Sequence, residues 1–236
     1  MCVAKSEAVL LRRQENGDGS MVDEHRPYQL YWYKAASSLA PMAVLEESGA
    51  AYEAVEIDAA VGEHKGAAYR EIHPLGLIPA LRLPDGRTVF ESAGIVMFVA
   101  DRHPEAGIAP EPVSADRAFY NQWLFYLADT LYPTYNRYYW AARFSTDPAD
   151  SERIKARCTK LLVNQWEVVE RALDGQDWLV GDGCTAADIY MQMITTWDAN
   201  PTAFRKRCPN VTRVAEATAA RPGVARALGR HVILGA

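Results

Sequence analysis

The sequence predicts a mixed α/β domain followed by an all-helical domain, which is the fold class α/β plus all-α. Three observations in the 236 residues support this prediction. Strand and helix patterns alternate over residues 27–103, as they do in α/β folds. A stretch rich in proline and without periodicity follows at 104–114, and we interpret it as a linker. Residues 115–236 then show helical spacing and no convincing strand, so the second domain is expected to be a helical bundle.

Each element of the first domain is expected from a local pattern. Tyr28 to Tyr33 is aromatic and partly alternating, which is typical of a β-strand. Ser37 and Ser38 precede an apolar segment with Pro41 in its first turn, a pattern typical of a helix N-terminus with a serine cap. The further expected elements are a strand at 52–57, a weak helix at 61–72, a hairpin with strands at 80–83 and 88–90, and a helix at 92–102. The order βα, βα, ββα is the thioredoxin-like order.

A proline at the mouth of the expected hairpin indicates a special bend. Proline donates no hydrogen bond to a strand ladder, so Pro79 is an unusual residue at this place. A cis bond between Ile78 and Pro79 would leave the N–H and C=O of Ile78 free to pair with another group. Glu91 and Ser92 begin the next helix, so a helix N-terminus is expected beside the bend. Together these features predict a site for an extended, partly anionic, peptide-like ligand.

The second domain is expected to consist of helices of unequal length. Asp116 to Phe144 is a long, aromatic-rich helical segment with a bend expected at Pro133. Thr185 and Asp188 form a variant of the capping box ahead of an apolar helix, and we interpret both as structural residues. The other expected helices lie at 150–173, 210–220 and 223–231.

Composition limits the possible functions. A net charge of −5 without a basic stripe argues against nucleic-acid binding. No apolar run approaches the roughly 18 residues of a membrane span, so no membrane partner is expected. The four cysteines are scattered without metal-ligand spacing, which predicts no metal site and fits a reducing, cytoplasmic location. Residues 1–26 are interpreted as a flexible leader, within which Met21 is an alternative translation start.

Two motifs resemble those of the cytosolic glutathione S-transferases. The first is Ile78-Pro79 together with Glu91-Ser92-Ala93-Gly94-Ile95, and the second runs from Trp178 to Ile189 around the capping box. The resemblance covers residues 28–231, and the stretch from Tyr31 to Pro41 is most similar to bacterial beta-class members. It implies a cytoplasmic detoxification enzyme that uses glutathione as co-substrate, needs no metal and acts as a homodimer.

The resemblance also implies roles for individual residues. Ile78 and Pro79 would pair with the cysteinyl part of glutathione, and Glu91 and Ser92 would hold its γ-glutamyl end. A hydroxyl group would stabilise the thiolate, since an ordinary thiol has a pKa of about 8.5. Beta-class members usually carry Cys at the position of Ser37, and Ser cannot form a mixed disulfide, so a hydrogen-bonding role is favoured. The candidates are Ser37, Ser38 or neither, in which case both serines are merely helix caps.

A dense run of aromatic residues in the second domain is predicted to line the binding pocket of the second substrate. Core packing explains part of the run, but tyrosine carries a polar end that suits a cleft. The predicted pocket residues are Tyr33, Trp123, Tyr132, Tyr135 and Tyr139. The leading hypothesis is thiolate attack of glutathione on a hydrophobic, aromatic small-molecule electrophile. The alternatives are glutathione-dependent ether cleavage, dehalogenation or isomerisation, and a non-catalytic binding module with the same fold.

Overall fold

A four-stranded sheet forms the centre of the first domain, with the strand order β2-β1-β3-β4. Strand β1 (Tyr28–Trp32) pairs in parallel with β2 (Tyr52–Glu56) and antiparallel with β3 (Ala80–Arg82). Strand β4 (Thr88–Phe90) completes the predicted hairpin with β3. The structure is a computed structural model that describes residues 26–231. The expected leader therefore lies outside the described residues except for Arg26.

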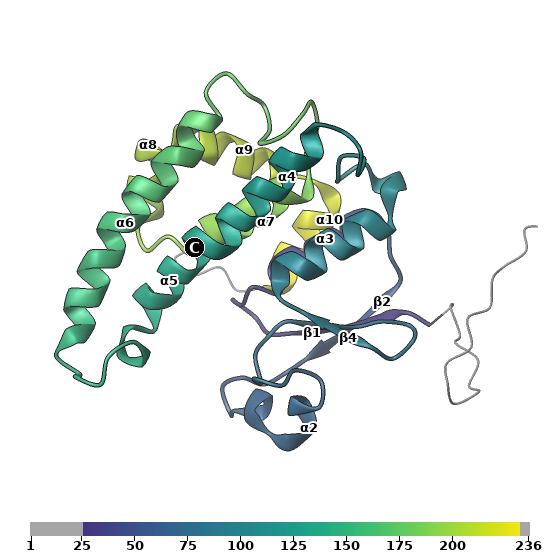
Figure 1. Cartoon of the computed structure of the whole chain (residues 1–236), viewed down its shortest axis with the longest axis horizontal. Helices are drawn as coiled ribbons and strands as arrows, with labels where there is room; N and C mark the ends of the chain where they lie inside the picture. Colours follow the sequence, from purple (N-terminus) through teal and green to yellow (C-terminus); the bar gives the residue numbers. More distant parts are fainter. Residues whose placement is uncertain (1–25, 232–236) are drawn as a thin grey trace, which may run out of the picture.

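Helices lie on both faces of this sheet (Figure 1). Helices α1 (Leu39–Ser48) and α3 (Ser92–Arg102) pack on one face, and the short α2 (Ala67–Arg70) lies on the other. The expected weak helix at 61–72 is divided into α2 and the 3₁₀ turn η1 (Glu63–Lys65). The thioredoxin-like order of strands and helices is thus confirmed, and the start and end of α3 agree with the prediction.

Side chains alternate along β1 as a strand requires. Leu30 and Trp32 point into the main core with α1 and α3. Tyr31 points to the opposite face, where its ring packs edge-on against Tyr69 of α2 with centroids 5.9 Å apart. The two faces of the sheet therefore serve different purposes, since one joins the rest of the molecule and the other supports the α2 segment.

The second domain is helical throughout the described residues. Its elements are α4 (Asp116–Phe125), the π-helical segment η3 (Tyr126–Leu131), α5 (Tyr132–Tyr139), the 3₁₀ turn η4 (Ala141–Arg143), α6 (Asp150–Ala172), α7 (Ala186–Thr195), α8 (Pro201–Arg207), α9 (Pro209–Ala219) and α10 (Pro222–Arg230). The turn η2 (Pro104–Ala106) lies in the expected linker. None of the helices in residues 26–231 combines the length and hydrophobicity needed to cross a membrane. The domain boundaries at 27–103 and 115–236 stay a prediction.

Two details of the helical domain differ from expectation. The long helix expected over 116–144 is interrupted by the π-helical η3, which ends two residues before Pro133. Proline has no N–H to offer to the preceding turn, so the hydrogen-bond pattern changes there. Helix α8 was not predicted, although Asn200 caps it by accepting a hydrogen bond from the N–H of Ala203 at 3.0 Å.

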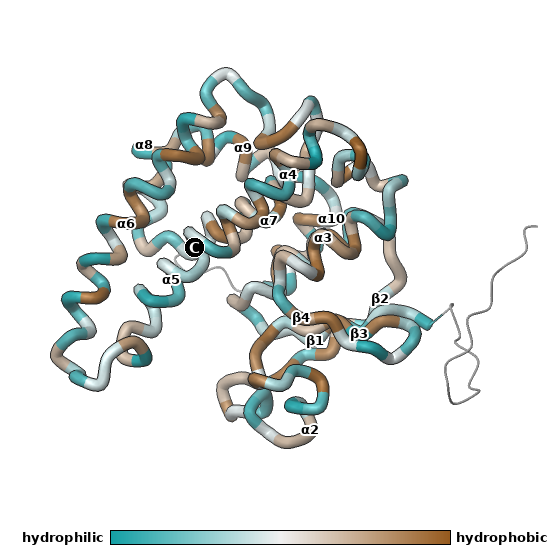
Figure 2. Tube along the Cα trace, viewed as in Figure 1, coloured by the Kyte–Doolittle hydropathy of each residue, from teal (hydrophilic) through white to brown (hydrophobic). Residues whose placement is uncertain are grey.

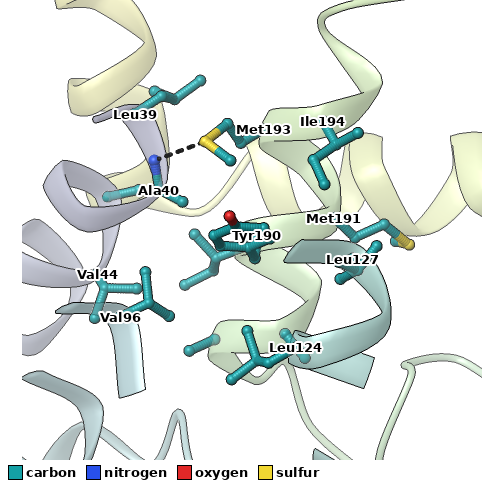
Figure 3. Close-up of a cluster of buried hydrophobic side chains, with 14 of the residues drawn as sticks. Leu39, Ala40, Val44, Val96, Leu124, Leu127, Tyr190, Met191, Met193 and Ile194 are labelled. Carbon is teal, nitrogen blue, oxygen red and sulfur yellow. Dashed lines mark hydrogen bonds between the residues drawn. The ribbon is translucent and has the colours of Figure 1, made fainter. Parts of the chain in front are cut away.

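Helix α7 is buried and packs against both domains. Figure 3 shows Tyr190 and Met193 of α7 beside Ala40 and Val44 of α1 on one side and Leu124 of α4 on the other. In Figure 2 many residues of α7, which is buried over Ala186 to Ile194, are hydrophobic, whereas α6 is largely hydrophilic. Helix α7 is therefore the common core element of the two domains.

A capping box begins α7. The carboxylate of Asp188 is completely buried and accepts hydrogen bonds from the N–H and hydroxyl of Thr185, each at 2.8 Å. It also accepts the N–H of Leu179 at 2.9 Å, which holds the preceding loop against the helix. Burial raises the pKa of Asp188, and these hydrogen bonds oppose that rise.

Helix α10 of the helical domain packs against α1 of the first domain. Helix α10 lies along α1, and the carboxylate of Glu47 at the end of α1 accepts the N–H groups of Gly223 and Val224 at 2.6 and 3.2 Å. Arg221 pairs with the same carboxylate at 2.7 Å. Glu47 therefore caps α10 with a charge of the sign that a helix N-terminus favours.

Candidate active site

The bend at Ile78 and Pro79 faces the start of α1. The peptide bond between the two residues is cis, as predicted. The carbonyl of Ile78 accepts a hydrogen bond from the hydroxyl of Ser37 at 3.4 Å, and within residues 26–231 its N–H has no hydrogen-bond acceptor. Tyr69 supports the preceding residue by donating to the carbonyl of Leu77 at 2.9 Å. The backbone of Ile78 is thus held in place while its N–H stays available.

The loop before the bend is fixed by a close approach of two backbone segments. Gly76 has a φ of +57°, and a Cβ at this position would lie 2.2 Å from the carbonyl oxygen of His64. Lys65 donates from Nζ to the carbonyl of Gly76 at 2.6 Å and to that of Leu75 at 3.3 Å. Glycine is therefore required here for both conformation and space.

The two candidate serines differ in what they contact. Ser38 is buried, and its hydroxyl donates to the carbonyl of Tyr33 at 3.0 Å and accepts the N–H of Tyr33 at 3.3 Å. Ser37 accepts a hydrogen bond from the hydroxyl of Tyr132 at 3.3 Å, and its own hydroxyl points to Ile78. Ser38 is the N-cap residue of α1, as predicted, but no side-chain hydrogen bond caps that helix. Both hydroxyls instead bond to groups outside it.

Tyr132 is the residue of the helical domain that contacts Ser37. It is the first residue of α5, and its ring packs edge-on against Trp197 with centroids 5.1 Å apart. Burial raises the pKa of Tyr132, the hydrogen bond with Ser37 opposes the rise, and the negative charge of Glu91 adds to it. Tyr132 is therefore a neutral phenol that can donate a hydrogen bond.

Glu91 and Ser92 lie at the N-terminus of α3. Glu91 has a φ of +70°, one of two positive values among the non-glycine residues described, and its side chain is exposed. Such a conformation costs about 1–3 kcal/mol, and residues that adopt it cluster at active sites, ligand clamps and switch regions. Ser92 is buried, and its hydroxyl lies 2.8 Å from that of Tyr190 on α7. The first N–H groups of α3 have no acceptor within the helix and can bind an anion.

The other predicted pocket residues are not all gathered at Ser37. Trp123 packs in the core, edge-on against Tyr126. The hydroxyl of Tyr135 is buried between the indole N–H of Trp166 at 2.8 Å and Asp198 at 3.3 Å. Tyr139 is partly exposed and donates to the carbonyl of Trp197, so it is connected to Tyr132 through that residue. Tyr33 takes part through its backbone.

Two residues at the site were missed from the sequence. Trp197 follows α7 and supports Tyr132, and Tyr190 binds Ser92 from within α7. Neither stands in a motif, because each reaches the site through the packing of α7 against both domains. Within the described residues no group of three or more His, Cys, Asp or Glu side chains could hold a metal ion.

Comparisons with known protein families match most of the chain. A model described as "Glutathione S-transferase, N-terminal domain" matches residues 38–102, and one described as "Glutathione S-transferase, C-terminal domain" matches residues 135–230. The curated "Glutathione S-transferase GST-4.5" of Xanthomonas campestris pv. campestris is 28% identical over 169 residues, which are 72% of this chain and 81% of that protein.

Solved structures agree with these matches. A sphingomonad glutathione S-transferase complexed with glutathione is 30% identical, with a TM-score of 0.74 over 85% of this chain and 97% of that one. The bacterial glutathione S-transferase BphK, solved as a ternary complex, is also 30% identical, with a TM-score of 0.75 over 85% and 98% of the two chains. A beta-class enzyme of Sphingomonas chungbukensis is 27% identical, with a TM-score of 0.74 over 85% of this chain and 97% of that one.

Proposed function

Because this chain belongs to the glutathione S-transferase family, we propose that it binds glutathione at the Ile78 bend and transfers its thiolate to a hydrophobic, aromatic electrophile. The observation that carries the proposal is the position of the Ser37 hydroxyl, between the carbonyl of Ile78 and the hydroxyl of Tyr132. A cysteinyl residue paired with the backbone of Ile78 would bring its sulfur beside Ser37.

Ser37 would stabilise the thiolate by donating a hydrogen bond to it. Since Tyr132 donates to the oxygen of Ser37, the proton of Ser37 is free to point elsewhere. In the structure it points to the carbonyl of Ile78, and the peptide N–H of glutathione can replace it there. A hydrogen bond to a charged group contributes about 1.5–3 kcal/mol, which lowers a thiol pKa by about one to two units.

The N-terminus of α3 would hold the γ-glutamyl end of glutathione. The exposed carboxylate of Glu91 suits its ammonium group, and the free N–H groups at the start of α3 suit its carboxylate. Ser92 would add a contact to that carboxylate, with its position set by Tyr190. The positive φ of Glu91 is consistent with a residue placed for a ligand rather than for its helix.

Two measurements test this function. Calorimetric titration with glutathione should show binding, and incubation with glutathione and 1-chloro-2,4-dinitrobenzene should release chloride and form the thioether. Absence of glutathione binding at millimolar concentration, together with no conjugation of any member of an electrophile panel, would show that the proposal is wrong.

A second reaction is favoured by the state of Tyr132. A phenol whose pKa is raised by burial stays protonated at neutral pH and can donate to the oxygen or halide that leaves an aryl ether or haloaromatic compound. Product analysis with aryl ethers and halogenated aromatic compounds distinguishes cleavage from simple addition. Cleavage products that appear with the wild-type protein and disappear in Tyr132→Phe would support this second reaction.

We also propose that the protein forms a homodimer in the cytoplasm. Three phenylalanines are exposed on β4 and α4, namely Phe90, Phe119 and Phe125 at 42%, 55% and 56%. Exposed aromatic side chains are enriched at the cores of protein interfaces. The cysteines in the described residues are buried and free, as expected in a reducing compartment. Sedimentation as a monomer would contradict the dimer.

A further inference from the structure

A small pocket lies at the C-terminal end of α5, the helix that begins with Tyr132. Its volume is about 290 Å³, close to the roughly 300 Å³ of the smallest ligand pockets and suited to one aromatic ring. Two aromatic side chains and two basic ones are among its lining residues, which are Tyr139, Trp140, Ala141, Ala142, Arg143, Ser151 and Lys155. Aromatic walls with nearby cations suit a ligand that is both aromatic and anionic.

Arg143 is the cation most available to such a ligand. Its guanidinium carbon lies 4.2 Å from the centre of the Trp140 ring, which is a cation–π contact. Lys155, in contrast, pairs with Glu152 at 3.0 Å. Among residues 26–231 no carboxylate forms an ion pair with Arg143. Its fork of N–H donors is therefore free to bind a carboxylate.

The charge of Arg143 also acts on two basic residues of the first domain. Burial lowers the pKa values of His64 and Lys65, and the positive charge of Arg143 lowers both further. No carboxylate opposes this effect at either residue. Lys65 and Arg143 thus bring like charges together from the two domains without a counter-charge, and a bound anion would relieve their repulsion.

A chain of contacts connects this pocket to the candidate active site. Tyr139 donates to the carbonyl of Trp197, and Trp197 packs against Tyr132, which contacts Ser37. Tyr132 and Tyr139 are the first and last residues of α5, so they are about 10 Å apart along the helix axis. A molecule of about this length can react beside Ser37 and still reach the pocket.

We propose that the second substrate is an elongated aromatic acid whose carboxylate binds Arg143. This inference rests on the proposed glutathione transfer. The ring lies against Tyr139 and Trp140, and the electrophilic end meets the thiolate beside Ser37. With an enone acid, the sulfur forms a bond to the terminal alkene carbon and the π electrons move to the carbonyl oxygen. The resulting enolate takes a proton from water, and the carboxylate is unchanged.

Ethacrynic acid and its neutral primary amide form a matched pair of probes. Both carry the same enone at one end of the ring, and they differ in the charge at the other end. We expect the wild-type protein to prefer the acid in kcat/KM by about 5- to 10-fold, the range for one partly exposed ion pair with bidentate geometry. The preference should fall in about 0.5 M NaCl because salt screens exposed charges.

Variants of two arginines distinguish binding of the carboxylate at Arg143 from a general effect of the protein's positive charge on an acidic substrate. Arg143→Gln should raise the KM for the acid by about 5- to 10-fold and leave the amide unchanged. Arg143→Lys should keep part of the preference. Arg205→Gln is the matched control, because Arg205 is exposed on α8 and its partner is Glu216 at 3.4 Å. It should behave as the wild type with both probes.

Three results would overturn the proposal. The first is equal turnover of acid and amide by the wild type, and the second is an equal effect of Arg143→Gln on both. The third is an effect of Arg143→Gln confined to the KM for glutathione, which would assign Arg143 to the glycyl carboxylate of that tripeptide. Calorimetric binding of acid and amide without glutathione tests the pocket separately, and equal binding of the two counts against it. If 1-chloro-2,4-dinitrobenzene is conjugated while these tests fail, the transfer activity stands and the anion site does not.

Discussion

The hydroxyl of Tyr132 donates a hydrogen bond to the oxygen of Ser37 across the junction of the two domains, at 3.3 Å. The same Ser37 oxygen lies 3.4 Å from the carbonyl of Ile78. The group proposed to stabilise the glutathione thiolate is therefore oriented by the helical domain, although it belongs to the thioredoxin-like one.

Replacement of the two serines should have different consequences. Ser37→Ala removes the hydrogen bond proposed to stabilise the thiolate, so the pKa of bound glutathione should rise toward about 8.5. The kcat at neutral pH should fall by about 10- to 100-fold, as expected for loss of a charged hydrogen bond. The pH dependence of kcat measures this shift directly.

Ser38→Ala is the matched control. It removes the acceptor of the part-buried N–H of Tyr33, whose carbonyl keeps the N–H of Ala36 at 3.3 Å, so it should lower the free energy of unfolding by about 1–3 kcal/mol. It should leave the pKa of bound glutathione unchanged. If Ser37→Ala kept the wild-type pH dependence of kcat, or if Ser38→Ala shifted it, Ser37 would not be the residue that stabilises the thiolate.

Tyr132→Phe keeps the ring against Trp197 and removes the hydroxyl that orients Ser37. The kcat should fall by about 3- to 10-fold, the size expected for one neutral hydrogen bond, with little change in the melting temperature. Because burial raises the pKa of Tyr132, its ionisation should not contribute to the pH profile between about pH 6 and 9. An inflection in that range that is lost in Tyr132→Phe would be evidence against a neutral phenol.

Gly76→Ala tests the loop that supports the bend. Its Cβ would lie 2.2 Å from the carbonyl oxygen of His64, so the loop must move and the affinity for glutathione should fall. Gly86→Ala is the control, since Gly86 also has a positive φ, of +88°, but no atom lies within 4 Å of the added Cβ. Both variants carry the left-handed backbone cost of about 1–2 kcal/mol. Titration with glutathione should separate them, and similar affinities would argue against a role of the loop in binding.

Glu47→Ala tests the contact between α1 and α10. It leaves Arg221 and the N–H groups of Gly223 and Val224 without their acceptor, so the free energy of unfolding should fall by about 2–3 kcal/mol. Glu167→Ala removes an exposed carboxylate paired with Arg171 and should cost less than about 1 kcal/mol. Denaturant titration compares the two, and equal losses would show that Glu47 is no more than a surface charge.

His231 should make stability depend on pH. Burial lowers its pKa to about 4 from an ordinary value of about 6.5, and its ring packs against Trp32 with centroids 5.1 Å apart. The folded state therefore binds this proton less readily than the unfolded state. The stability contribution is complete above about pH 6.5 and is lost as pH falls toward 4, by up to about 3 kcal/mol.

The His231→Phe variant isolates this contribution. Phenylalanine keeps a ring beside Trp32 and cannot take up a proton. Denaturant titrations at several pH values should show a smaller loss of stability between about pH 6.5 and 4 than in the wild type. Identical pH dependence in the two proteins would show that His231 is not protonated with a lowered pKa.

Features that a few neighbouring residues determine could be predicted from the sequence, whereas contacts that depend on the packing of distant segments could not. Pro79 and Glu91 could be assigned to a ligand site because a missing N–H donor and a helix start are visible in a few residues. The contact of Ser37 with Tyr132 was not predictable, since it depends on how α5 packs against the first domain. Ser38 is the N-cap residue of α1 as predicted, but the partner of its hydroxyl was not predictable, because a serine hydroxyl at that position can bond either forward into the helix or back to the strand.

The helical domain shows the same limit. The π-helical η3 has no distinct hydrophobic spacing, so it could not be separated from α4 and α5. Helix α8 carried a usable signal, Asn200 followed by Pro201, that was not recognised. Trp197 has no local signal at all.

The packing of α10 along α1 has a consequence for synthesis of the chain on the ribosome. The face of α1 that meets α10 is made long before residues 222–230, which cover it and follow every other described helix in the chain. Until then the nascent first domain exposes apolar surface that can associate wrongly, as is common when domains fold before their partners are complete. Synthesis of α10 is therefore the step that completes the cover of α1.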